Sequence, residues 1–93
     1  MPKLLIVKVF VFLLFSKDIY EGRRHVHILS KKKRIRSVAK FWIEPDIELV
    51  HPGNFNKKEL NEIMQLIDKN LGIINKQIDN FLGGKKVKLI IIK

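Results

Sequence analysis

The sequence contains no cysteine, which excludes disulfide bonds and zinc sites built on thiolate ligands. Acidic residues are scarce, because nine Asp and Glu stand against nineteen Lys and Arg, which gives a net charge of +10. The most apolar stretch, residues 4–15, is interrupted by Lys8 and is too short for a transmembrane helix, which needs about 20 apolar residues. We therefore expect a cytoplasmic protein that does not bind a membrane.

The chain does have enough apolar residues, 46% of its 93 positions, to fold as one small domain. Its excess positive charge attracts polyanions such as nucleic acid, an anionic membrane surface or an acidic protein. The alternative is that the lysines form an ordinary solvated surface.

Four segments in the first half of the chain have the composition or the alternation of β-strands: residues 4–15, 24–29, 37–43 and 47–50. The first is rich in β-branched and aromatic residues and apolar on both faces, which predicts one long strand in the middle of a sheet. Pro45 ends the third strand, because proline has no N–H to donate to a neighbouring strand.

The start of a helix is marked at Lys57. Asn56 and Glu59 have the spacing of a capping box, in which each side chain accepts a hydrogen bond from the other residue's backbone N–H. Phe55 and Leu60 have the spacing of a hydrophobic staple, in which two apolar side chains meet across the first turn. These signals predict that the helix begins at Lys57.

Apolar residues then recur at spacings of three and four: Leu60, Ile63, Met64, Ile67, Leu71, Ile74, Ile78, Phe81 and Leu82. The spacing predicts one helix of about 25 residues, with any bend at Gly72 and an end at Gly83 and Gly84. Residues 85–93 are expected to form a last strand at a sheet edge. The fold class is α+β: a small antiparallel sheet of three to five strands, in the order β-β-β-α-β, with one long helix on one face of a single domain.

The stretch from residue 23 to residue 43 concentrates the residues with functional chemistry. Alternation puts His25 and His27 on one face of their strand, and Lys40 and Trp42 on one face of the next. Two histidines about 7 Å apart, surrounded by positive charge, suit metal-free RNA cleavage with one as general base and the other as general acid. His25 and His27 are therefore candidate catalytic residues.

The alternative role for the two histidines is structural. His25 would then pair with Trp42 across the strands, and His27 with Lys40, and together they would cap a sheet face. A zinc site would need further ligands. The side chains available for that are Glu44, Asp46, Glu48 and His51. No spacing singles them out, so we predict no metal and no cofactor.

The basic residues of the same stretch and its tryptophan form a candidate nucleic-acid-binding surface: Arg23, Arg24, Lys31, Lys32, Lys33, Arg34, Arg36, Lys40 and Trp42. The lysine-rich loop either contacts phosphates or is a solvated hairpin tip. Trp42 either stacks on a base or anchors a protein interface, or else it faces the helix as core and Phe41 is exposed.

In order, the chain carries a Phe-rich strand, an acidic turn, the motif His25-Val26-His27-Ile28, the motif Lys40-Phe41-Trp42-Ile43 and a Lys-Glu-Leu sequence at the start of the helix. From residue 10 to residue 81 this order resembles a small prokaryotic family, domain of unknown function 4160. The basic loop, residues 31–36, and the tail from residue 87 to residue 93 look like additions in this chain. The resemblance implies an association with two-gene toxin–antitoxin modules, and it supplies no activity or catalytic residue.

Two classes of function are consistent with these features. The first is a toxin–antitoxin-type component that binds RNA, with or without cleaving it. The second is a non-enzymatic interaction module that binds an acidic protein, such as the product of a neighbouring gene, or that forms a homodimer.

Overall fold

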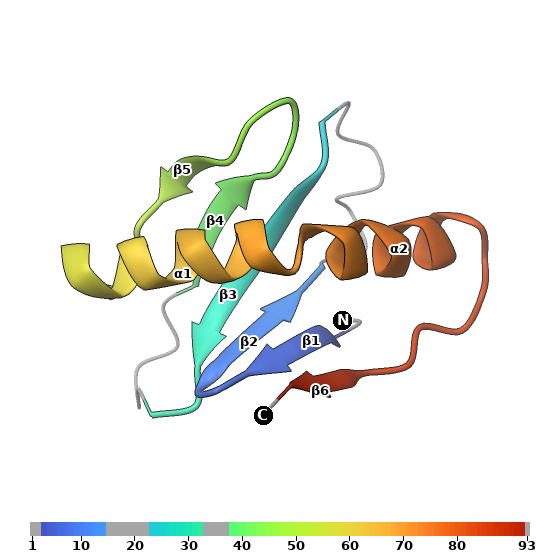
Figure 1. Ribbon diagram of the computed structural model, residues 1–93, viewed down its shortest axis with the longest axis horizontal. Helices are drawn as coiled ribbons and strands as arrows, with labels where there is room; N and C mark the ends of the chain where they lie inside the picture. Colours follow the sequence, from blue (N-terminus) through green and yellow to red (C-terminus); the bar gives the residue numbers. More distant parts are fainter. Residues whose placement is uncertain (1–2, 15–22, 33–37, 93) are drawn as a thin grey trace.

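The computed structural model describes residues 3–14, 23–32 and 38–92 (Figure 1). In chain order its elements are β1 (Lys3–Val7), β2 (Phe10–Leu13), β3 (His25–Ser30), β4 (Ala39–Trp42), β5 (Glu48–His51), α1 (Lys57–Lys69), α2 (Leu71–Leu82) and β6 (Ile90–Ile92). The three strands predicted between residues 24 and 50 are confirmed as β3, β4 and β5. Residue 15 of the first predicted strand and residue 37 of the third lie outside the described residues.

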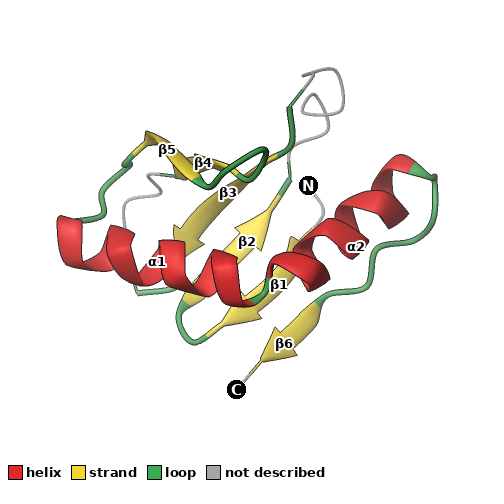
Figure 2. Cartoon of the chain, turned by 45° about the horizontal axis from the view of Figure 1, so that its top comes forward, coloured by secondary structure: helices red, strands yellow, loops and turns green. Residues whose placement is uncertain are grey.

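The strands form one sheet in the order β5-β4-β3-β2-β1-β6. Neighbouring strands are antiparallel except β6, which runs parallel to β1. The α+β class is confirmed, whereas a purely antiparallel sheet of three to five strands was wrong. The direction of β6 is set by a connection between distant parts of the chain. The two helices carry the chain from the β5 edge across the sheet to the β1 edge, where β6 joins in the direction of β1 (Figures 1 and 2).

The predicted long first strand is in fact two strands, β1 and β2, joined by a turn at Lys8 and Val9. Val7 pairs with Phe10 across this turn, and Lys8 has a φ of 56°. A positive φ at the first turn residue is typical of type II′ hairpins, which usually have glycine there. The apolar run contains no glycine, asparagine or proline, so the isolated charge of Lys8 was the one local sign of a turn.

The predicted single helix is two helices, α1 and α2, separated at Asn70. The Asn70 side chain donates a hydrogen bond of 2.9 Å to the carbonyl oxygen of Leu66. An asparagine side chain that bonds the backbone in this way competes with regular helical hydrogen bonding. Figure 2 shows that α2 leaves the line of α1. Gly72 lies inside α2, so the expected bend was assigned to the wrong residue.

The two ends of the helical region are as predicted. The Asn56 side chain accepts from the Glu59 N–H over 2.8 Å, and the Glu59 carboxylate accepts from the Asn56 N–H over 3.0 Å. This capping box starts α1 at Lys57. Gly83 and Gly84 follow α2, and Gly84 has a φ of 75°, which glycine adopts without a Cβ clash. Within the described part of the chain, no helix is long and apolar enough to cross a membrane.

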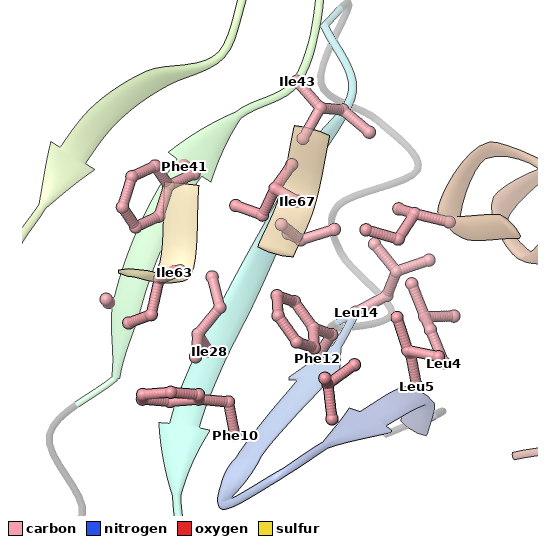
Figure 3. Packing of buried hydrophobic residues seen from close by; sticks show 14 of the residues in the cluster. Leu4, Leu5, Phe10, Phe12, Leu14, Ile28, Phe41, Ile43, Ile63 and Ile67 are labelled. Atoms are coloured by element: carbon pink, nitrogen blue, oxygen red, sulfur yellow. The ribbon is translucent and has the colours of Figure 1, made fainter. Parts of the chain in front are cut away.

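Both helices pack on the same face of the sheet and bury the main core between the two layers (Figure 3). Phe12 of β2, Ile28 of β3 and Phe41 of β4 are fully buried there, as are Ile63 and Ile67 of α1. Burial of a side chain of this size stabilises the fold by roughly 1.5–3 kcal/mol. Because side chains alternate along a strand, this packing assigns every second residue of β3 and β4 to the core.

The opposite face of the sheet, which neither helix covers, carries the remaining side chains of each strand. Over β1 and β2 it holds a small apolar cluster of Ile6, Val11 and Leu13, against which Leu29 of β3 packs. Along β3 and β4 histidine, lysine and tryptophan take these places. The character of this face therefore changes from apolar to polar between β2 and β4.

Replacing Asn56 by alanine removes an acceptor from the first turn of α1. We expect the free energy of unfolding to fall by about 1 kcal/mol, measured by urea denaturation. Asn56→Ser keeps a capping oxygen and should stay within about 0.5 kcal/mol of the native protein. Equal losses for the two variants would contradict a stabilising cap.

Candidate functional site

The candidate site lies on β3 and β4, on the sheet face away from the helices. His25 pairs with Trp42 across the strands, and His27 pairs with Lys40. The His25 ring is nearly perpendicular to the Trp42 ring and to the His27 ring, with 5.2 Å between ring centroids in each pair. The structure thus brings together the four side chains predicted on one face. With Arg23, which also contacts Trp42, they are termed the β3–β4 cluster.

The two histidines are held inside this cluster. His25 is 1% exposed, and its Nδ1 lies 3.2 Å from the carbonyl oxygen of Arg23. A carbonyl oxygen can only accept, so Nδ1 carries the proton of this hydrogen bond. The Nε2 atoms of His25 and His27 are both buried. This burial favours the structural role, since a general acid or base has to reach its substrate. The catalytic role stays a prediction.

Trp42 is half-buried on the helix-free face, while its neighbour Phe41 is core. The alternative in which Trp42 faces the helix is therefore wrong. Two cations lie over its ring, because the Arg23 guanidinium carbon and Lys40 Nζ are each 4.8 Å from the ring centroid. Contacts of this kind contribute about 0.5–1 kcal/mol at exposed sites. They hold positive charge next to the indole.

Arg23 is positioned by two acidic residues that follow β4. Its side chain donates to the carbonyl oxygen of Glu44 and forms an ion pair of 3.3 Å with Glu48 on β5. The Glu44 carboxylate accepts from the Arg24 N–H over 3.0 Å. From the sequence, Glu44 and Glu48 are candidates only for metal ligands, and no sequence signal indicates that they hold Arg23. The closeness of Glu48 to Arg23 depends on the pairing of β5 with β4, which no local signal predicted.

Arg24 lies on the other side of the sheet from Arg23. Its guanidinium donates to the Asn75 side chain over 3.0 Å and forms an ion pair with Asp79, so it connects β3 to α2. The structure therefore separates Arg24 from Arg23, Lys40 and Trp42 of the β3–β4 cluster. Strand alternation indicates the position of Arg24. Arg24 and Val26 are two residues apart and so share a face of the strand, and Val26 is in the core.

Lys31 and Lys32 follow β3 and are both exposed. The Lys31 N–H donates to the Val9 carbonyl oxygen over 2.9 Å, and the Lys32 N–H donates to Ser30 Oγ over 3.2 Å. These bonds fix the backbone where the basic loop begins. The other predicted residues of this loop, Lys33, Arg34 and Arg36, lie outside the described residues.

The order of these elements can be compared with known families. A family model described as a domain of unknown function, DUF4160, matches residues 10–77. The chain belongs to the DUF4160 family. The resemblance carried by the paired histidines and the Phe-Trp motif is thereby confirmed. The match extends from β2 into α2, so β1 and β6 lie outside it. Searches of curated proteins and of solved structures found no significant match.

The possible metal ligands of this DUF4160 protein do not converge in the described part of the chain. Among residues 3–14, 23–32 and 38–92, no three His, Asp or Glu side chains come close enough to hold one ion. Two of the acidic candidates, Glu44 and Glu48, contact arginines instead. His51 lies opposite Lys40 in the β4–β5 pairing.

The contact of Arg24 with α2 should contribute to stability. We expect Arg24→Ala to lower the free energy of unfolding by about 1 kcal/mol, because the Arg24 side chain is 27% exposed and the Asp79 side chain 63% exposed. Urea denaturation of Arg24→Ala, Asp79→Ala and the double variant would give the coupling between them. Lys58→Ala, at an exposed position of α1, is the control. Strict additivity of the two losses would rule out the interaction.

Proposed function

We propose that this DUF4160 protein is a cytoplasmic RNA-binding component of a toxin–antitoxin-type pair, and that it binds RNA without cleaving it. One observation carries the proposal: a half-buried tryptophan has an arginine and a lysine each 4.8 Å from its ring centroid, on a sheet face that neither α1 nor α2 covers. A sheet face with an aromatic ring and flanking cations is a common platform for single-stranded RNA, whose bases stack on the ring while cations meet the phosphates.

The distribution of positive charge supports a strand of RNA running along β3. Arg23 and Lys40 lie beside Trp42, and Lys31 and Lys32 extend from the far end of the same strand. Trp42 lies opposite His25 at one end of β3, and the six residues of that strand, or about 20 Å, separate it from Lys31. Phosphate contacts at both ends would align a bound strand with the β3–β4 hairpin.

Binding without cleavage is favoured by the state of the histidines. His25 is 1% exposed and its Nδ1 donates to a carbonyl oxygen, while the Nε2 atoms of both histidines are buried. In the proposed role the His25 ring contacts Trp42 and the His27 ring contacts His25, so that both histidines help to hold Trp42 in place. The toxin–antitoxin part of the proposal is supported by the gene association that the family resemblance implies.

The proposal predicts that the cluster and the end of β3 both contribute to RNA affinity. Trp42→Ala should weaken binding of a short single-stranded RNA by about 1–3 kcal/mol, and Trp42→Phe by less, because phenylalanine still stacks. Lys31→Ala/Lys32→Ala should reduce the slope of log K against log[salt] by about 1.4, since each lost phosphate contact contributes about 0.7. Fluorescence anisotropy over a salt series measures both effects.

The matched control is Lys57→Ala/Lys58→Ala, which removes the same charge from exposed positions of α1. It should leave the salt slope nearly unchanged. Absence of RNA binding at low salt, or an equal effect of the two double variants, would refute the proposed surface. Cleavage of the RNA by the purified protein, lost in His25→Ala/His27→Ala, would show that the protein is a nuclease instead.

The toxin–antitoxin part is tested separately in cells. When this gene and its neighbour are expressed one at a time, one of them should stop growth, and co-expression of both should restore it. In the same assay, Trp42→Ala should abolish whichever effect this protein has. Normal growth under all three conditions would dismiss the toxin–antitoxin role and leave RNA binding to the anisotropy experiment.

A further inference from the structure

The last strand, β6, leaves one edge of the sheet open. It pairs with β1, and in the described part of the chain no strand lies on its outer side (Figures 1 and 2). Its middle residue, Ile91, is 62% exposed. Leu89 and Ile90 beside it are exposed too, as is Leu82 at the end of α2. Among the described residues, apolar side chains and backbone groups that face no neighbouring strand therefore occur together at this edge.

Such an edge usually carries its own protection against pairing with another chain. Proteins keep the edge strand short, place lysine, proline, a β-bulge or an inward-pointing charge in it, or cover it. β6 has two of these devices, because it is three residues long and lysines flank it in the sequence, whereas the strand itself is three isoleucines with no charge or proline. Lysines deter a basic strand but attract an acidic one. The other edge strand, β5, differs, because Glu48 and His51 lie in it and Glu48 pairs with Arg23.

The charge around β6 indicates what kind of segment would fit. Lys85, Lys86 and Lys88 lead into the strand and are exposed. No Asp or Glu occurs after Asp79, so this end of the chain is uniformly basic. A second copy of the chain is disfavoured, because it carries the same net charge of +10 and the same lysines beside its own β6. An acidic segment has the complementary charge.

The segment leading into β6 is held in place by a buried side chain of α2. Gln77 is 5% exposed, and its Nε2 donates to the carbonyl oxygens of Leu4 on β1 and of Lys88, over 3.0 and 2.5 Å. The Gln77 amide thus connects α2 to β1 and to Lys88, which lies shortly before β6. A strand fixed in this way loses little conformational entropy when another strand adds to it.

From these contacts we infer that the β6 edge binds an extended acidic segment of a partner protein as a seventh strand. The backbone of that segment pairs with the outer backbone groups of β6, as in other cases of strand addition. Its central apolar residues cover Ile91, and its acidic residues meet Lys85, Lys86 and Lys88. This surface is separate from the β3–β4 cluster, so the inference does not depend on RNA binding.

The probe for this inference is the acetylated peptide Glu-Glu-Val-Thr-Val-Glu-Glu, titrated into the full-length 15N-labelled protein. We expect amide shifts concentrated at residues 88–92 and saturation at peptide concentrations of about 1 mM or less. Lys85→Glu/Lys86→Glu/Lys88→Glu should weaken binding at least about tenfold. A peptide with lysine in place of each glutamate should not bind.

The matched control is Lys57→Glu/Lys58→Glu/Lys69→Glu, which makes the same charge change on exposed positions of α1 and should alter affinity by less than about twofold. No shifts at residues 88–92, or equal weakening by the two triple variants, would overturn the inference. Light scattering tests whether a second copy of the chain occupies the edge instead. A dimer that Ile91→Lys dissociates would make a second copy the occupant of the edge and would also overturn it. A protein that failed to bind RNA but still bound the peptide would leave the inference intact.

Discussion

The packing of both helices against one face of the sheet is the constraint on which the other surfaces of the molecule depend. Phe41 and its core neighbours have to lie under α1, and strand alternation then sends His25, Lys40 and Trp42 to the opposite face. A shift of one residue in the pairing of β4 with β3 would turn Lys40 and Trp42 toward the helices and Phe41 away from them. The candidate site is therefore a consequence of the core.

Arg23 and Arg24 are consecutive in the chain but make contacts on opposite faces of the sheet. Arg24 belongs to the helix side, where Asn75 and Asp79 bind it, and Arg23 belongs to the cluster side, where it contacts Trp42 and Glu48. Their contacts also link β3 to α2 on one side and to β5 on the other. The same pair of residues thus fixes the hairpin from both faces.

The sheet order separates the two candidate interaction surfaces. β4 and β6 are four strand positions apart, or about 20 Å, with β3, β2 and β1 between them. The cluster lies within the region matched by the DUF4160 model, whereas β6 lies beyond it. An RNA on the sheet face and a protein strand on the β6 edge could therefore be bound at once. This arrangement is compatible with a protein that acts in a pair.

The sequence by itself determined the features that depend on neighbours within a few residues. These are the capping box at Asn56, the alternation that puts His25 and Trp42 on one face, and the α+β class. The helix break at Asn70 has a local cause, the hydrogen bond from its side chain to the Leu66 carbonyl oxygen, although the apolar spacing does not reveal it. Two other features depended on tertiary structure: the turn at Lys8 and the parallel pairing of β6 with β1. Lysine has no intrinsic preference for a positive φ, and β1 and β6 meet across most of the chain. Such choices are made by the packing of the whole molecule, because no local energy difference decides them.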